Sequence, residues 1–231
     1  IIEENVRIVF TSAGNPKTWT GILKEKGITV VHVVSSSKFA RKAEEAGCDA
    51  VVAEGFEAGG HNGREETTTL VLIPAVVNAV KIPVIAAGGI ATGRQMLAAM
   101  VLGAEGVQMG SRFVASEEAS SHNSFKQAVI RSSEGDTQLM MKQLTPVRLL
   151  KNAFFTEVQQ AELRGATVEE LKTLLGRARA KKGMFEGDIE QGELEIGQVS
   201  AILDDILPAG QIVKNVWQEF MNGLAEPVKM L

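Results

Sequence analysis

His61 is the residue whose type and setting best suit catalysis. It lies in the loop of residues 56–66, where Gly59, Gly60 and Gly63 surround it. The reference pKa of a histidine side chain, about 6.5, suits proton transfer at neutral pH, and glycines leave room for a ligand beside the ring. We therefore interpret His61 as an acid–base residue, with an ordinary surface-loop histidine as the alternative.

Two carboxylates, Glu54 and Glu57, lie close enough to His61 in the sequence to make a metal site a weaker alternative. The chain has 3 histidines and a single cysteine, Cys48, so a metal site needs carboxylate ligands. We expect no metal. The sequence also lacks the G-x-S-x-G, H-E-x-x-H, P-loop and G-x-G-x-x-G motifs, which excludes the simplest readings as a serine hydrolase, zinc protease, NTPase or Rossmann dehydrogenase.

Two short apolar segments are each followed by small residues, Gly88 and Gly89 after the first and Gly110 and Ser111 after the second. Glycines after a strand turn their backbone N–H groups towards a phosphate with no Cβ in the way, and a serine adds a hydroxyl donor. Either pair alone is also typical of a tight turn. Two such loops on neighbouring strands favour a phosphate site, to which Arg112 would add positive charge if it pointed inward.

The elements that must hold these loops alternate between strand and helix. Strands are predicted to begin near positions 6, 28, 50, 83 and 106, with a helical pattern between each pair. This indicates five consecutive βα units of a parallel sheet. A flavodoxin-like open sheet needs about five strands and a barrel needs about eight, so the count leaves both open.

Two further residues belong to this predicted sheet. Asn15 lies in the loop of residues 11–16, which follows the first strand and reaches the same ligand-binding edge. His32 lies inside the second strand, and we interpret it as a core or barrel-lining histidine.

From residue 117 onward the pattern changes to amphipathic helices and polar loops. Residues 183–197 are rich in glycine and acids and predict a loop, whereas helices are predicted over residues 120–133, 146–164, 167–180, 198–207 and 211–224. We divide the chain into a barrel-like part, residues 1–116, and a mainly helical part, residues 117–231. The second part is expected to cover the barrel mouth, contact a partner subunit, or both.

The composition sets broad limits. The 231 residues carry a formal net charge of −4 and are 45% hydrophobic. A large core is therefore possible, and a nucleic-acid partner is not expected. No apolar run approaches the ~18 residues of a transmembrane helix, and no signal-peptide pattern is present. We expect a cytoplasmic protein without membrane contact, in which Cys48 stays reduced.

Three motifs in order resemble a known enzyme family. They are A-E-G-F-E-A-G-G-H-N-G at residues 53–63, I-P-V-I-A-A-G-G-I-A-T-G at 82–93 and L-G-A-E-G-V-Q-M-G-S-R-F at 102–113. With V-R-L-L-K-N at 147–152 and G-E-L-E-I-G-Q at 192–198, the chain is similar to the FabK-type enoyl-acyl-carrier-protein reductase II. That family is an FMN-dependent branch of the nitronate monooxygenase (2-nitropropane dioxygenase) superfamily.

The resemblance implies a TIM-type (β/α)8 barrel with a helical C-terminal substrate subdomain. It implies that NAD(P)H reduces FMN and that the flavin reduces a trans-2-enoyl thioester on acyl carrier protein, in a homodimer that responds to a monovalent cation. By this resemblance His61 lies near flavin and substrate, and orients them or helps to protonate the α-carbon. The implied FMN-binding residues are Gly88, Gly89, Gly110 and Ser111 at the phosphate, with Asn15, Glu54, Gly59 and Gly60 as further contacts.

One departure concerns the N-terminus. The family has about three more βα units before the first strand of this chain, including a glycine-rich loop under the flavin ring. We therefore expect a barrel that lacks its first three βα units, and we expect these 231 residues by themselves not to bind FMN tightly. The alternatives are a nitronate monooxygenase using FMN and O2, a flavin-free sugar-phosphate enzyme, and a truncated, non-catalytic fragment of a reductase.

Overall fold

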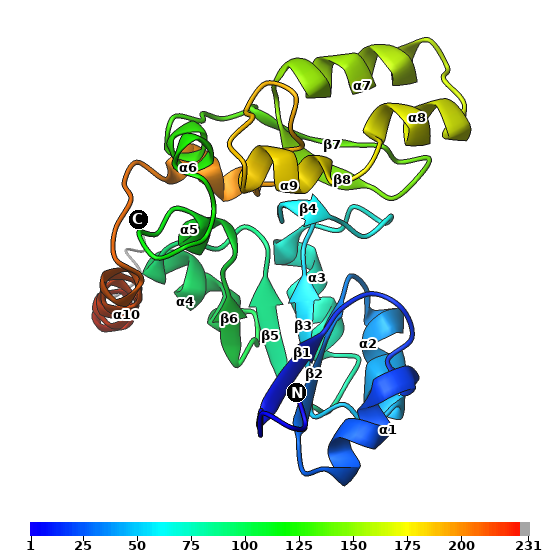
Figure 1. Ribbon diagram of the computed structural model, residues 1–231. Helices are drawn as coiled ribbons and strands as arrows, with labels where there is room; N and C mark the ends of the chain where they lie inside the picture. Colours follow the sequence, from blue (N-terminus) through cyan, green and yellow to red (C-terminus); the bar gives the residue numbers. More distant parts are fainter. Residues whose placement is uncertain (227–231) are drawn as a thin grey trace.

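Five parallel strands form the main sheet (Figure 1). The structure, a computed structural model, describes residues 1–226. The strands lie in the order β1 (Ile8–Thr11), β2 (Thr29–Val34), β3 (Ala50–Glu54), β5 (Val84–Ala87) and β6 (Gly106–Gln108), and each neighbouring pair is parallel. The predicted run of five parallel strands is confirmed.

The spatial order of these strands follows their order in the chain, so each crossover adds the next strand at the same edge. A doubly wound sheet such as that of flavodoxin reverses its winding once, with strand order 2-1-3-4-5. In the described part of this chain, each new parallel strand is added on the same side of the previous one, as in a (β/α) barrel. Strand order therefore decides between the two architectures that the strand count left open.

Four helices connect the strands: α1 (Lys17–Glu25), α2 (Ser37–Glu45), α3 (Thr69–Val77) and α4 (Gly93–Val101). Alternate residues of β2 face opposite sides of the sheet. Val30 and Val34 belong to the core cluster that contains helix residues, whereas Val31 packs with Val52 and Ala87 on the other face. Burial on both faces explains why the strands are near-continuous apolar runs.

A second, antiparallel sheet joins distant parts of the chain. Its strands are β4 (Gly60–His61), β8 (Val147–Leu150) and β7 (Thr137–Met140), with β8 in the middle. The prediction of a helix over residues 146–164 was wrong in its first part, because β8 precedes helix α7 (Ala153–Leu163). A short apolar run such as V-R-L-L is compatible with either state, and only its pairing partners make it a strand.

Two other predicted helices differ from the structure. The helix predicted over residues 167–180 is divided into α8 (Val168–Leu175) and α9 (Arg179–Met184), because Gly176 and Ala178 have positive φ values of 65° and 59°. The helix predicted over residues 198–207 is only the short 3-10 helix η1 (Gln198–Ile202). The remaining helices are α5 (Ser111–Val114), α6 (Asn123–Ile130) and α10 (Ala209–Ala225).

Helices are the main regular secondary structure of residues 117–226, and β7 and β8 form an unexpected strand pair there. The division of the chain at residue 116 stays a prediction. Within residues 1–226, no helix has both the length and the hydrophobicity needed to cross a lipid bilayer.

The last helix returns to the barrel part of the chain. α10 packs along α4, and the Glu219 carboxylate accepts a hydrogen bond from the backbone N–H of Gly93 at 2.8 Å. Gly93 begins α4, and a Cβ at this position would overlap backbone atoms of Val216 and Phe220. The missing side chain allows the two helices to touch.

We expect Gly93→Ala to lower the free energy of unfolding by about 1–3 kcal/mol, because the added methyl group forces α10 away from α4. Thermal or urea unfolding measures this change. The matched control is Gly21→Ala inside α1, where an added Cβ has no neighbour within 4 Å. That variant should gain roughly 0.5–1 kcal/mol. Equal stability of the two variants would contradict the close packing of α10.

Candidate functional site

The glycine loops line a small cavity at the carboxyl-terminal ends of β3, β5 and β6. Its volume is about 210 Å³. Six of the predicted site residues line it: Glu54, Gly59, Gly88, Gly89, Gly110 and Ser111. The structure thus brings together residues from three separate loops, in the region where a (β/α) barrel binds its ligands.

The backbone around this cavity has unused hydrogen-bond donors. No hydrogen bond within residues 1–226 uses the backbone N–H of Gly89, Gly110 or Ser111. The Ser111 hydroxyl oxygen accepts a hydrogen bond from the Gly197 N–H at 2.9 Å, which leaves the hydroxyl hydrogen free to be donated. A Cβ added at Gly110 would meet no atom within 4 Å, so it would extend into open space. These groups fit an oxyanion such as phosphate.

Arg112 is not part of this donor set. Its buried guanidinium donates a hydrogen bond to the Asp205 carboxylate at 2.6 Å. The idea that Arg112 adds positive charge to the phosphate site is therefore wrong. A buried guanidinium needs a partner, and Asp205, far along the chain, supplies it.

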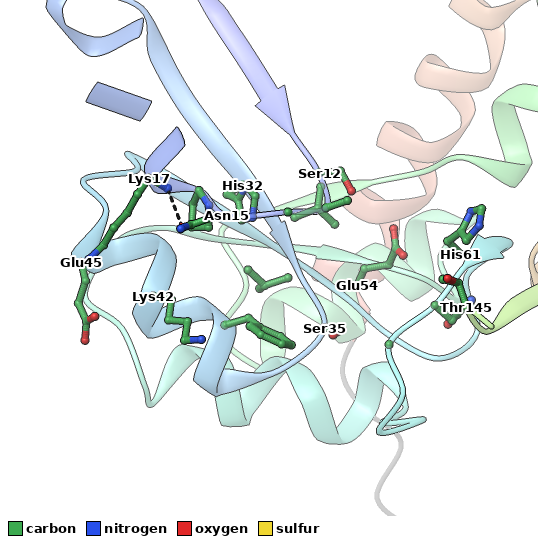
Figure 2. Close-up of a pocket in the computed structure, with 18 residues that line it drawn as sticks. Ser12, Asn15, Lys17, His32, Ser35, Lys42, Glu45, Glu54, His61 and Thr145 are labelled. Atoms are coloured by element: carbon green, nitrogen blue, oxygen red, sulfur yellow. Dashed lines mark hydrogen bonds between the residues drawn. The ribbon is translucent and has the colours of Figure 1, made fainter. Parts of the chain in front are cut away.

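A larger cavity, of about 720 Å³, lies beside the first (Figure 2). Asn15, Glu54 and His61 line it. In Figure 2, His61 and Thr145 lie on one side, Asn15 lies on the other, and Glu54 lies between them. Glu54 lines both cavities, so the cavity that contains the predicted catalytic histidine adjoins the one that the glycine loops line.

Glu54 ends strand β3, and burial raises the pKa of its carboxyl group to about 7. His32 also lines the larger cavity, but it is buried, with 5% of its surface exposed. Its Nδ1 shares a hydrogen bond of 2.7 Å with the Thr11 hydroxyl, and burial lowers the pKa of the His32 ring. The interpretation of His32 as a buried, barrel-lining histidine is confirmed.

The loop that carries His61 is fastened at several points. The Glu57 carboxylate accepts hydrogen bonds from the backbone N–H and the hydroxyl of Thr69, at 2.9 and 2.8 Å. Arg148, which is 1% exposed, donates from Nη2 to the Phe56 carbonyl at 2.8 Å and lies 4.4 Å from the centre of the Phe56 ring. The His61 loop is therefore held by β8 as well as by the barrel.

Gly59 and Gly60 have packing roles that the sequence did not reveal. A Cβ on Gly59 would overlap the backbone of Ile196, and one on Gly60 would lie 2.6 Å from Oε2 of Glu195. Gly59 lines the smaller cavity, whereas Gly60 lines neither of the two. Both glycines allow residues 195–197 to lie directly against the His61 loop.

Sequence reasoning missed Glu195, Gln108 and Arg148 as members of the site. Glu195 and Gln108 line the smaller cavity, and Arg148 holds the His61 loop. Glu195 and Arg148 lie in motifs that resemble those of a known family. No local sequence pattern indicates, however, that these two side chains lie at the site. Within residues 1–226, no group of 3 or more His, Cys, Asp and Glu side chains is arranged to hold a metal ion.

The singly wound parallel sheet, with two cavities at its carboxyl-terminal edge, is that of a barrel-type α/β protein, a class in which this edge is the usual ligand-binding edge. The model of the nitronate monooxygenase family matches residues 1–219, and the chain belongs to that family.

Individual relatives agree with this assignment. The chain is 34% identical, over 94% of its length, to a probable nitronate monooxygenase from Staphylococcus saprophyticus, and it spans 63% of that protein's length. FabK from Thermotoga maritima is 43% identical, with a TM-score of 0.91 over 97% of this chain and 71% of FabK. Nitroalkane oxidase from Streptomyces ansochromogenes is 30% identical, with a TM-score of 0.79 over 97% of this chain and 67% of that enzyme.

The raised pKa of Glu54 predicts a pH-dependent stability. The unfolded carboxyl group ionises near its ordinary value of 4.5 and the folded one near 7, so ionisation destabilises the folded state as pH rises through this window. Glutamine cannot ionise, so Glu54→Gln should avoid this loss of stability. As pH rises from acidic to mildly alkaline, we expect the free energy of unfolding of Glu54→Gln to increase by about 1–2 kcal/mol relative to that of wild type. This figure is reduced to allow for the partial exposure of Glu54.

Urea unfolding at a series of pH values measures this difference. The control is Glu25→Gln, since Glu25 is exposed on α1 and lines neither cavity. If Glu54→Gln and wild type keep a constant difference at every pH, the buried, largely protonated state of Glu54 is refuted.

Proposed function

We propose that this protein is a flavin-dependent oxidoreductase that binds FMN and uses NAD(P)H to reduce a trans-2-enoyl thioester on acyl carrier protein. The observation that carries the proposal is that Glu54 lines both cavities. An oxyanion-binding donor set and a histidine suited to proton transfer therefore lie in two adjoining cavities at one edge of the sheet. The similarity to FabK over 97% of the chain supports the reductase in particular.

The residues present fit FMN. Its phosphate can accept hydrogen bonds from the backbone N–H groups of Gly89, Gly110 and Ser111 and from the Ser111 hydroxyl. Gly88 also lines this cavity. Bound FMN would supply hydride transfer between NAD(P)H and the substrate's β-carbon. Asn15 and Glu54 line the larger cavity, where they are available to contact the flavin or the substrate.

His61 has the second role in this proposal. When the β-carbon has accepted a hydride, the α-carbon needs a proton, and an imidazolium is a suitable donor at neutral pH. His61 is exposed towards the larger cavity, so an entering substrate can reach it. Its position next to Gly60 on β4, paired with β8, keeps the ring at the cavity wall.

Burial raises the pKa values of both Glu54 and Glu195, because their charged forms are poorly solvated there. Both carboxyl groups are therefore more readily protonated than exposed ones, and both line the cavity of the proposed phosphate site. The preference for the reductase over the monooxygenase rests on the similarity to FabK.

Nitronate monooxygenase is the second candidate, because several relatives are named as probable nitronate monooxygenases. In that case the substrate has already lost the proton on its α-carbon, so His61 would contact the nitronate anion and would not donate a proton to carbon. The cofactor would be the same, and the two functions differ in their substrates. In the reductase NAD(P)H would reduce the flavin and an enoyl thioester would reoxidise it, whereas in the monooxygenase the substrates would be a nitronate and O2.

The deciding experiment uses protein produced from the complete reading frame, in the absence of air. Flavin absorption bands that bleach with NADPH and recover on addition of crotonoyl thioester establish the reductase. Bands that bleach only with a nitronate establish the monooxygenase. A colourless protein that takes up no added FMN refutes both and returns the oxyanion site to a sugar-phosphate ligand.

Gly110 offers a separate test of the phosphate position. Its φ of −94° is accessible to alanine, and an added Cβ enters open space, so Gly110→Ala should fold normally but weaken FMN binding about tenfold or more. Fluorescence titration of the flavin-free protein, produced from the complete reading frame as above, measures the dissociation constant. Gly106→Ala is the matched control, since its Cβ also meets no atom within 4 Å but Gly106 lines neither cavity. Equal FMN affinity in both variants would place the phosphate elsewhere.

A further inference from the structure

The peptide group between Gly88 and Gly89 is held at its carbonyl end by a residue from another loop. The hydroxyl of Thr69, the first residue of α3, donates a hydrogen bond to the Gly88 carbonyl oxygen at 2.9 Å. On the other side of the same peptide bond, the Gly89 N–H has no hydrogen-bond partner within residues 1–226. Gly89 lines the smaller cavity, whereas Thr69 lines neither of the two.

The planarity of the peptide group converts this contact into a direction for the N–H. No peptide bond within residues 1–226 is cis, and in a trans peptide the C=O and N–H bonds point in opposite directions. Because the Gly88 oxygen points towards α3, the Gly89 hydrogen points away from α3. No residue of α3 lines the smaller cavity, so this is the orientation that leaves the N–H available to a ligand there.

Two consecutive glycines leave this orientation underdetermined. Gly88 and Gly89 have φ values of 83° and 69°, and glycine populates positive and negative φ about equally readily. The glycines therefore permit the observed turn without enforcing it. The hydrogen bond from Thr69 selects one orientation of the peptide group among those that the two glycines allow.

Glu57 holds the Thr69 side chain at this point. Its carboxylate accepts a hydrogen bond from the Thr69 backbone N–H at 2.9 Å, and its Oε2 lies 2.8 Å from the Thr69 hydroxyl. The hydroxyl has a single hydrogen, so the Glu57 carboxylate and the Gly88 carbonyl share it. The backbone bond to Glu57 does not depend on the hydroxyl, so α3 stays attached to the His61 loop when the hydroxyl is removed.

Gly55 allows these groups to lie so close together. It follows β3, and its N–H donates to the Ala87 carbonyl at 2.9 Å, directly before Gly88. A Cβ on Gly55 would overlap the Thr69 hydroxyl oxygen and would lie 2.8 Å from Oε2 of Glu57. The loops that follow β3 and β5 and the start of α3 therefore meet at one point, behind the peptide group that borders the smaller cavity.

We propose that Thr69 is a positioning residue for the oxyanion site, whose hydroxyl orients the Gly88–Gly89 peptide group so that the Gly89 N–H is presented to a phosphate. This inference rests on the proposed binding of FMN, whose phosphate is the expected oxyanion. Thr69 does not touch the ligand. Without its hydroxyl the peptide group is free to rotate, and the donor must be ordered at the expense of binding energy.

The experiment compares FMN with riboflavin, which has the same ring system but no phosphate. Thr69→Ala and Thr69→Ser differ from each other only in the hydroxyl group. We expect Thr69→Ala to bind FMN about tenfold more weakly than wild type, the effect of one hydrogen bond to a charged group, and to bind riboflavin with unchanged affinity. Thr69→Ser should bind FMN within about threefold of wild type. Fluorescence titration of flavin-free protein from the complete reading frame measures both dissociation constants.

Thr68→Ala is the matched control. Thr68 precedes Thr69, its exposed side chain makes no capping hydrogen bond to α3, and it lines neither cavity. This variant should bind both flavins as wild type does. Thermal unfolding of the flavin-free variants shows whether they fold. If Thr69→Ala does not, Thr69→Val, which also lacks the hydroxyl, takes its place in the comparison with Thr69→Ser.

The ratio of the two affinities separates positioning from a general loosening of the site. Equal weakening of FMN and riboflavin binding in Thr69→Ala would show that the hydroxyl only supports the fold, and would overturn the proposal. Wild-type FMN affinity in Thr69→Ala would also overturn it and would leave the flavoprotein intact. A wild-type protein that binds FMN no more tightly than riboflavin would refute the phosphate site itself, and with it the role of Thr69.

Discussion

The close contact between residues 195–198 and the glycine loop is the constraint on which the rest of the site depends. Gly59 has no side chain, and the backbone of Ile196 occupies the space where a Cβ would be. Two hydrogen bonds hold the contact, from the Gly197 N–H to the Ser111 hydroxyl and from the Gln198 N–H to the Glu57 carbonyl, both at 2.9 Å. One short segment thus joins two barrel loops and closes the smaller cavity.

Burial also sets the electrostatics of the site. It removes water from the carboxyl groups of Glu193, Glu195 and Glu54, the last of which lies at the end of β3. Their charged forms are poorly solvated, so their pKa values rise towards neutrality. The two of them that line the smaller cavity, Glu54 and Glu195, are therefore more readily protonated than an exposed glutamate.

The glycines of the site serve different physical purposes. Gly88 has a φ of 83° and lies so close to the Gly55 carbonyl that a Cβ would be 2.7 Å from its oxygen, so the turn itself requires glycine. Gly110, by contrast, has a negative φ and open space before it, so its missing side chain is available to a ligand. A glycine-rich motif therefore combines folding constraints with binding constraints, and only the local geometry separates them.

The sequence by itself determined the five βα units and the loops at their carboxyl-terminal edge, because these depend on periodicity and on neighbours within a few residues. Tertiary structure alone decided the strand state of β8, the Arg112–Asp205 ion pair and the bridge between Leu149 and Glu195. Each of these depends on a partner far along the chain. No local pattern specifies such a partner, and burial and backbone pairing select it only when the whole chain folds.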